Sequence, residues 1–153
     1  MDPANPQTVR ELLERMDAGW ADFRERVHAA PNELIERHIE EGAWTRKQML
    51  AHIATWHEIT ADRLSQFRDS GAPADFEDQE DAINARAARA ATGRTTGEVI
   101  QSIEDTYRRL RREVGQLTDE QIANNDGWAV AIVRGNTFGH YEEHLPDLEP
   151  ARR

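Results

Sequence analysis

Two histidines near the C-terminal end, His140 and His144, have the spacing that most directly suggests chemistry. On a helix, side chains four residues apart project from the same face, so both imidazoles can bind one metal ion. His52 could add a third imidazole, because it lies at the edge of the apolar stripe of an earlier helical segment. Three imidazoles from two helices would leave a coordination position open to water or substrate. The spacing is thus compatible with a divalent metal site, and ordinary core and surface histidines are the alternative.

Glu143 lies between the two C-terminal histidines and could act as a base. The segment from His140 to His144 fits the H-x-x-E-H pattern of one class of zinc proteases. Those enzymes need a further acidic ligand well downstream, whereas only nine residues follow His144 here. We therefore do not predict a protease, and we expect Glu143 to be a base, a hydrogen-bond partner of the histidines, or a surface glutamate.

The other histidines, the serines and the glycines do not indicate a second kind of catalytic or binding site. His57 follows His52 by five residues, which turns it to the opposite flank of the stripe and predicts a packed histidine. No serine lies in a nucleophile-elbow context, and no glycine-rich loop has the spacing of a phosphate or dinucleotide site. The chain has no cysteine, so a metal must be bound by His, Asp or Glu, and any thiol must come from outside the chain.

The elements that position these residues are helices. Apolar residues recur at steps of three and four in four long segments, as in helices that bury one face. The segments run from Val9 to Pro31, from Thr45 to Gly71, from Thr95 to Leu117 and from Trp128 to near Pro146, with a shorter helix from about Glu80 to Ala91. Capping-box pairs begin at Thr8, Thr45, Thr95 and Thr118. We therefore predict an all-α protein, an antiparallel four-helix bundle, whose interior is a usual place for metal sites.

Length and charge limit the organisation and the partners. The 153 residues fit a single domain over 1–153, and no segment has the apolar length of a membrane span. The N-terminus lacks a signal-peptide pattern, so we expect a cytoplasmic protein. A net charge of −10 predicts no nucleic acid and no membrane surface as partner. The arginines at 108, 109, 111 and 112 are then a solvated helix face paired with acidic neighbours.

Three motifs resemble one family. The segment from Trp44 to Trp56, WTRKQMLAHIATW, resembles the W-(S/T)-x-K-(D/Q)-x-L-A-H-(I/L)-x-x-W signature in the second helix of the DinB/YfiT-like superfamily. The segment from Gly135 to His144, GNTFGHYEEH, is similar to the closing H-x-x-x-H segment of that superfamily. The segment DAINAR, residues 81–86, resembles the ClbS/DfsB branch.

The resemblance implies a four-helix bundle in up-down-down-up order with a divalent metal ion, commonly zinc or nickel. His52, His140 and His144 fill the positions of its ligands. Known activities in the superfamily include transfer or isomerisation with low-molecular-weight thiols such as mycothiol and bacillithiol, and hydrolytic protection against a DNA-damaging metabolite in the ClbS branch.

Two functions follow as hypotheses. The first is a metal-dependent hydrolase or thiol-dependent transferase for a small, electrophilic or toxic molecule. Trp56, Asn136, Tyr141 and Glu143 would then surround the metal. The second is a non-catalytic protein that binds or sequesters a small molecule in the bundle core. A homodimer is expected for such a small bundle.

Overall fold

The computed structural model describes residues 5–73 and 79–149, and the regular elements there are helices. They are α1 (Val9–Ala29), α2 (Asn32–Ile35), α3 (Arg46–Ser70), α4 (Glu80–Thr92), α5 (Thr96–Gly115), α6 (Asp119–Ala123), α7 (Trp128–Asn136) and α8 (Phe138–His144), with short 3₁₀ turns at Asn125–Gly127 and Leu145–Leu148. The prediction of an all-α protein is therefore confirmed.

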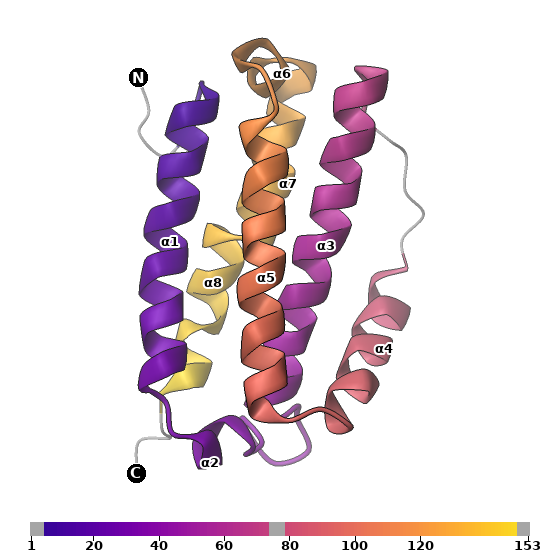
Figure 1. The fold of residues 1–153 in the computed structure, drawn as a ribbon. Helices are drawn as coiled ribbons and strands as arrows, with labels where there is room; N and C mark the ends of the chain where they lie inside the picture. The colour runs from indigo at the N-terminus through magenta and orange to yellow at the C-terminus, as the bar shows by residue number, and fades with distance from the viewer. Residues whose placement is uncertain (1–4, 74–78, 150–153) are drawn as a thin grey trace.

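Four long helical elements form the bundle (Figure 1). In that view α1 runs downward, α3 and α5 both run upward, and α7 followed by α8 runs downward. Parallel neighbours need a crossover connection, and α4 lies in the connection between α3 and α5. α3 packs mainly against α5 and α4, and α1 packs against α5 and α8. Seen from the opposite end of the bundle, the four elements run up, down, down and up, which is the order that the resemblance implies.

Threonine caps begin the helices where the sequence predicts them. The hydroxyls of Thr45, Thr95 and Thr118 accept a backbone N–H three residues on, and the Gln or Glu there accepts the N–H of the threonine. Thr8 differs, because its hydroxyl accepts from the Glu11 N–H and itself donates to the Glu11 carboxylate at 3.2 Å. The contacts of Thr45 fix the start of α3 at Arg46, six residues before His52.

The C-terminal segment is two helices, because the chain breaks at Thr137. Thr137 has φ −128° and ψ −108°, is buried, and donates its hydroxyl to the Val133 carbonyl at 2.7 Å. At Gly19 an added Cβ would lie 2.7 Å from Phe138 Cβ, so the break brings α8 onto α1. Our reading of residues 128–146 as one helical projection is therefore wrong, although His140 and His144 still share the short helix α8.

Apolar side chains from all four elements meet in one core. The largest fully buried side chains include Phe23 on α1, Leu64 and Phe67 on α3, Leu110 on α5 and Tyr141 on α8. Among the described residues, no helix is long and apolar enough to cross a membrane.

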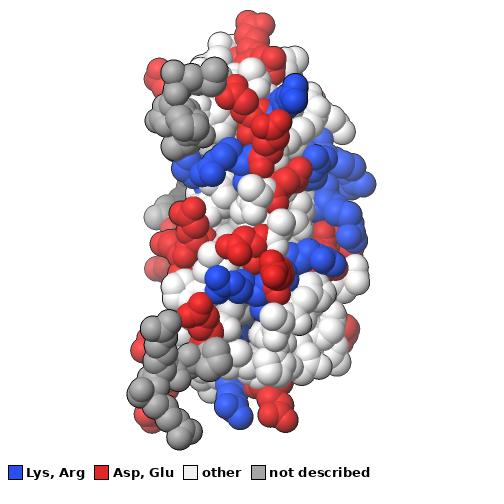
Figure 2. Space-filling model, turned by 90° about the vertical axis from the view of Figure 1, so that its left-hand side faces the viewer, with Lys and Arg blue, Asp and Glu red and all other residues white. Residues whose placement is uncertain are grey.

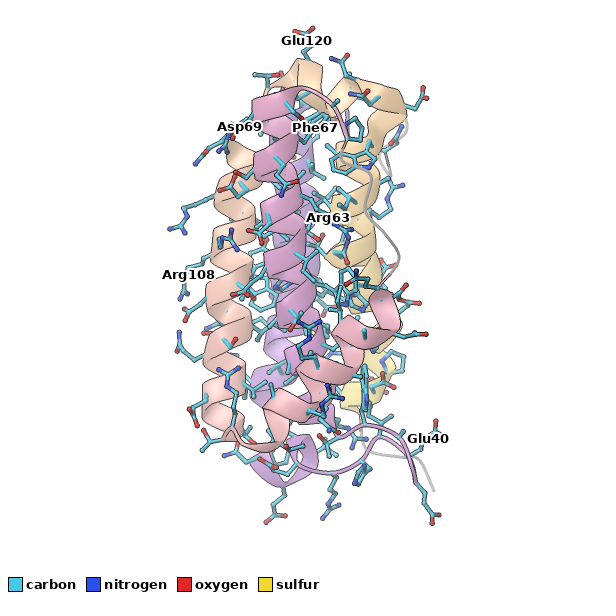
Figure 3. The ribbon with its side chains drawn as sticks, turned by 90° about the vertical axis from the view of Figure 1, so that its right-hand side faces the viewer. Glu40, Arg63, Phe67, Asp69, Arg108 and Glu120 are labelled. Atoms are coloured by element: carbon cyan, nitrogen blue, oxygen red, sulfur yellow. The ribbon has the colours of Figure 1, made fainter. Side chains whose placement is uncertain are left out.

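The surface mixes charges of both signs, as the face on the α1 side shows (Figure 2). Three arginines of α5 form ion pairs: Arg108 with Asp105, Arg109 with Asp62, and Arg111 with Asp17. Figure 3 shows Arg108 projecting outward from α5. For these three of the four α5 arginines, the pairs confirm the interpretation as a solvated face with acidic neighbours.

Candidate metal centre

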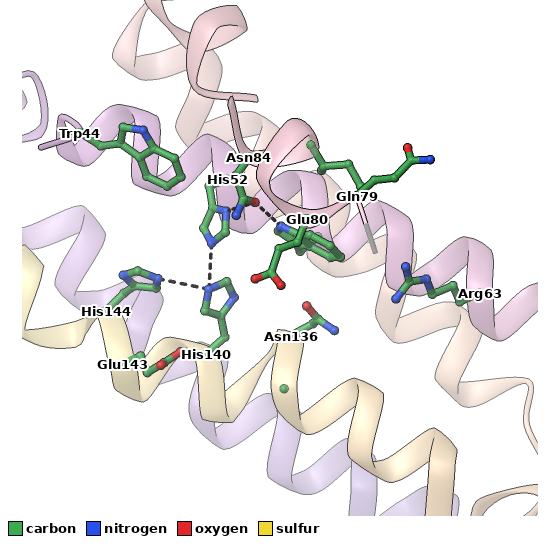
Figure 4. Close-up of a pocket in the computed structure, with 13 residues that line it drawn as sticks. Trp44, His52, Arg63, Gln79, Glu80, Asn84, Asn136, His140, Glu143 and His144 are labelled. Carbon is green, nitrogen blue, oxygen red and sulfur yellow. Dashed lines mark hydrogen bonds between the residues drawn. The ribbon is translucent and has the colours of Figure 1, made fainter. Parts of the chain in front are cut away.

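The predicted histidines come together between α3 and α8. Nε2 of His140 lies 3.0 Å from Nε2 of His52 and 3.1 Å from Nε2 of His144 (Figure 4). One nitrogen from each ring lies within 4.8 Å of the others, an arrangement that could hold a metal ion. His52 and His140 are each 8% exposed, and His144 is half-buried. His52 and His140 are 88 residues apart in sequence, yet α3 and α8 thus present three imidazoles to one point.

Asn84 on α4 orients the His52 ring. Its side-chain oxygen lies 2.9 Å from His52 Nδ1 and accepts the indole N–H of Trp56 at 2.7 Å. Because Asn84 Oδ1 can only accept, Nδ1 of His52 carries the proton and Nε2 presents its lone pair. The crossover helix therefore selects the imidazole tautomer that a metal ion requires.

Asp147 orients the His144 ring in the same way. Its carboxylate lies 2.9 Å from Nδ1 of His144, which places the lone pair of that ring on Nε2. The backbone carbonyl of Asp147 accepts from Nε of Arg46, a buried side chain at the start of α3. Arg46 also donates to the carbonyls of His38, Arg37 and Leu34. Arg46 thus links Asp147, the hydrogen-bond partner of His144, to the N-terminal end of α3.

The imidazoles of His52 and His140 are neutral at physiological pH. Burial lowers the pKa of His52 to about 4, against a smaller raising effect of its hydrogen bond to Asn84. Burial, with the neighbouring His144 and His52, lowers the pKa of His140 to about 3. A protonated ring here would lose solvent and face two other imidazoles.

The donor set fits a divalent cation. With Nδ1 protonated on His52 and His144, both Nε2 atoms carry lone pairs that point at His140. His140 can donate one Nε2 proton at most, which leaves a second nitrogen pair at about 3 Å with no proton between the atoms. Nδ1 of His140 is buried with no hydrogen-bond partner among the described residues. A cation between the three Nε2 atoms would remove the lone-pair conflict, so the residues present fit the metal that the resemblance implies.

A cavity of about 610 Å³ opens beside the histidines (Figure 4). This size is typical of a small-molecule site. Trp56, Asn136 and Glu143 line it as expected, with Glu143 exposed at its edge. The remaining described residues that line it, which the sequence reasoning missed, are Trp44, Arg63, Gln79, Glu80, Ile83, Asn84 and Gly135. Arg63 shares a face of α3 with His52 and Trp56, and this helical spacing is the sequence signal that could have identified it as a cavity residue.

Tyr141 does not line the cavity, and its predicted place beside the metal is wrong. One residue beyond His140, its side chain turns into the core, because successive helical residues point about 100° apart. Its hydroxyl lies 2.7 Å from Nε2 of His57, and Nδ1 of His57 lies 2.9 Å from the Thr106 hydroxyl. His57 is therefore a packed histidine, as predicted, and burial lowers its pKa to about 3.

Two solved structures resemble this fold. The first is a mutant of the mycothiol-dependent maleylpyruvate isomerase, with a TM-score of 0.73 and 18% sequence identity. The match covers 94% of this chain and 61% of the isomerase. The second is the colibactin self-resistance protein ClbS in complex with a dsDNA, with a TM-score of 0.74, 10% identity and 94% of each chain covered. At these identities the likeness shows the fold alone.

The exclusion of nucleic acid on net charge is wrong, because ClbS, which shares this fold, has been solved with duplex DNA. Net charge describes the whole chain, whereas DNA is contacted by one local surface through individual cations, hydroxyls and backbone N–H groups.

The sequence comparisons give the family. No curated protein matches this chain. Residues 2–145 match the DinB superfamily, which is nearly the whole length. The three-histidine cluster lies where the resemblance of the motifs places the ligands of that family. The chain therefore belongs to the DinB superfamily.

Proposed function

We propose that this protein is a metal-dependent enzyme that activates water or a low-molecular-weight thiol for attack on a small electrophilic molecule. The observation that carries the proposal is the convergence of the three Nε2 atoms of His52, His140 and His144 at the side of a cavity. Three protein ligands beside a cavity leave room for an exogenous fourth ligand, the usual arrangement of catalytic zinc sites.

Zinc or nickel suits a site of three imidazoles, which are borderline nitrogen donors, without a carboxylate or thiolate. Such an ion, when bound, supplies a Lewis acid that favours the deprotonated form of a water or thiol. Because the chain has no cysteine, a thiol nucleophile would come from a separate molecule.

The chain's own residues would position the reactants. Glu143 lies at the cavity edge and is our candidate for the base that takes the proton of the nucleophile. The side-chain nitrogen of Asn136 donates to the Ile132 carbonyl at 2.9 Å, which leaves its side-chain oxygen able to accept from a ligand. The indoles of Trp44 and Trp56 provide apolar surface on the α3 side of the cavity.

Turnover assays on zinc- or nickel-loaded protein test the proposal. Hydrolysis of p-nitrophenyl acetate reports a water nucleophile, and conjugation of chlorodinitrobenzene with mycothiol, bacillithiol or glutathione reports a thiol. We expect one of these activities to need metal and to fall by at least about a hundredfold in His140→Ala, with His28→Ala unchanged. Activity that survives His140→Ala or complete metal removal would contradict the proposal.

A second candidate is a binding or sequestering protein, and the likeness to the self-resistance protein ClbS over 94% of both chains favours it. In that case a small molecule would bind in the same cavity without turnover, and removal of the metal would leave its affinity nearly unchanged.

Duplex DNA is a candidate partner on the same ground. Fluorescence anisotropy of a labelled duplex, titrated with the protein at low and high salt, tests it. Binding that weakens steeply with salt would support phosphate contacts. No change in anisotropy at low salt would remove DNA as a partner.

A further inference from the structure

Arg63 gives the cavity a second polar end, away from the histidines. Of the described residues that line the cavity, it is the only lysine or arginine. Figure 3 shows Arg63 on the side of α3 that faces α7, and Figure 4 shows its guanidinium pointing back toward the histidine end of the cavity. A cation in this position could bind part of a ligand that also reaches the metal.

Helix geometry sets the separation of the two ends. His52 and Arg63 are 11 residues apart on α3, about 16 Å along the axis. Residues 52, 56, 59 and 63 share one face of this helix. The guanidinium lies closer to the histidines than this axial rise, because its Cζ lies 5.8 Å from the Trp56 ring and Trp56 is one turn from His52 on the same face. The guanidinium is thus on the order of 10 Å from the histidine cluster. A small elongated molecule can span this length.

The two ends share one support. Cζ of Arg63 lies 5.8 Å from the centre of the Trp56 ring, within cation–π range. Trp56 donates its indole N–H to Asn84, and the same Asn84 oxygen accepts from His52. Asn84 therefore orients both the metal-facing imidazole and the indole beside Arg63. One residue thus fixes the position of a side chain at each end of the cavity.

Charge selects the kind of group that Arg63 would bind. Partial burial lowers the pKa of Arg63, and its guanidinium still stays charged at neutral pH. Two carboxylates, Glu80 and Glu143, also line the cavity. Among the described lining residues there are thus one guanidinium and two carboxylates, a set that suits a single negative charge better than a phosphate dianion, and the planar fork of the guanidinium matches a carboxylate.

We propose that the substrate is a small carboxylate-bearing molecule whose carboxylate pairs with Arg63 while its reactive group lies at the three histidines. This inference rests on the proposed function and adds the substrate class. Arg63 is in this account a specificity-determining residue, and Trp56 supports it.

A set of thiol probes of increasing length tests the proposal. The ω-mercaptoalkanoates from mercaptoacetate to mercaptoundecanoate each have a matched ω-mercaptoalkanol without the carboxylate. The full-length protein is loaded with Co²⁺, so that thiolate binding produces a sulfur-to-cobalt charge-transfer band. Titration of this band gives an affinity for each probe without any assay of turnover.

We expect one intermediate length of carboxylate to bind about tenfold to hundredfold more tightly than its alcohol, the range for a hydrogen bond to a charged group. Arg63→Gln should remove this preference and leave the alcohols unchanged, and Arg63→Lys should restore part of it. Arg108→Gln, which removes an exposed arginine of α5, is the matched control for net charge.

Two other outcomes are separable. Charge-transfer bands with all probes but no preference for the carboxylate at any length, or a preference that survives Arg63→Gln, would overturn the substrate class and leave the metal centre intact. Failure of Co²⁺ to bind the histidines would instead overturn the proposed function, and this inference with it.

Discussion

The side-chain oxygen of Asn84 on the crossover helix lies 2.9 Å from Nδ1 of His52 on α3. Since that oxygen can only accept, the contact fixes which imidazole nitrogen of His52 faces His140 and His144. A residue on the helix that connects two parallel helices thus orients a ligand of the candidate centre.

Asn84→Ala should weaken metal binding by about tenfold to a hundredfold, the usual effect of losing a partner of a metal-binding histidine. Asn84→Asp keeps an acceptor for His52 and should retain most of the affinity. Competition of each variant with a chelating indicator for Zn²⁺ measures this. Equal affinities of the wild type and Asn84→Ala would show that the contact does not orient the ring.

Arg46 should be a strong contributor to stability, because it is 4% exposed and donates to the carbonyls of Asp147, His38, Arg37 and Leu34. Arg46→Met keeps the apolar stem and leaves these carbonyls without the guanidinium. We expect a loss of about 2–4 kcal/mol in the free energy of unfolding in urea.

Arg10→Met is the matched control for Arg46→Met, because the Arg10 side chain is 88% exposed and pairs with Glu14 one turn away on the helix surface. It should change stability by less than about 0.5 kcal/mol. Similar losses in the two variants would contradict the role assigned to Arg46.

The buried His57 should make the metal-free protein sensitive to acid. Its pKa is lowered from 6.5 to about 3 by burial. The unfolded chain therefore binds a proton at His57 as the pH falls below 6.5, while the folded chain does not. The stability that His57 contributes is present above pH 6.5 and is lost as the pH falls toward about 3, with about 2 kcal/mol lost at about pH 5.

Urea unfolding at about pH 7.5 and about pH 5, with chelator present, measures this loss. His57→Gln cannot titrate, so its loss over the same interval should be smaller than that of the wild type by about 2 kcal/mol. His52 and His140 remain in both proteins and cancel in the comparison. Identical losses would mean that His57 accepts a proton in the folded state.

Gly19 should tolerate no side chain, because an added Cβ would lie 2.7 Å from Phe138 Cβ where α8 crosses α1. We expect Gly19→Ala to destabilise the fold by about 1–3 kcal/mol, despite the higher helix propensity of alanine. At Gly97 the nearest atom to an added Cβ is 4.0 Å away, so Gly97→Ala should be neutral or slightly stabilising. Thermal unfolding of both variants decides this, and an unchanged Gly19→Ala midpoint would refute the tight contact.

Local signals predicted the positions of the long helical segments and the three histidines. Threonine caps and apolar stripes depend on residues three and four apart, so they can be read from sequence. The break at Thr137 could not be predicted, because it depends on the contact between Phe138 and Gly19 across two helices.

The partners of the histidines escaped prediction for a similar reason. Asn84 lies on a different helix and reaches His52 only through tertiary packing, so no local periodicity marks it as a neighbour of the histidines. Arg63 shares a face of α3 with His52, but that spacing alone does not show that a cavity lies beside it. Tyr141 was misplaced because its neighbour His140 faces the cavity, while Tyr141 itself points into the core toward His57.

X-ray diffraction at the metal absorption edge, on crystals of untagged protein grown with zinc or nickel, tests the metal centre most directly. We predict one anomalous peak per chain at about 2.0–2.1 Å from Nε2 of His52, His140 and His144, with a further coordination position open to the cavity. Crystals that contain the metal but show no peak between these three nitrogens would contradict the account.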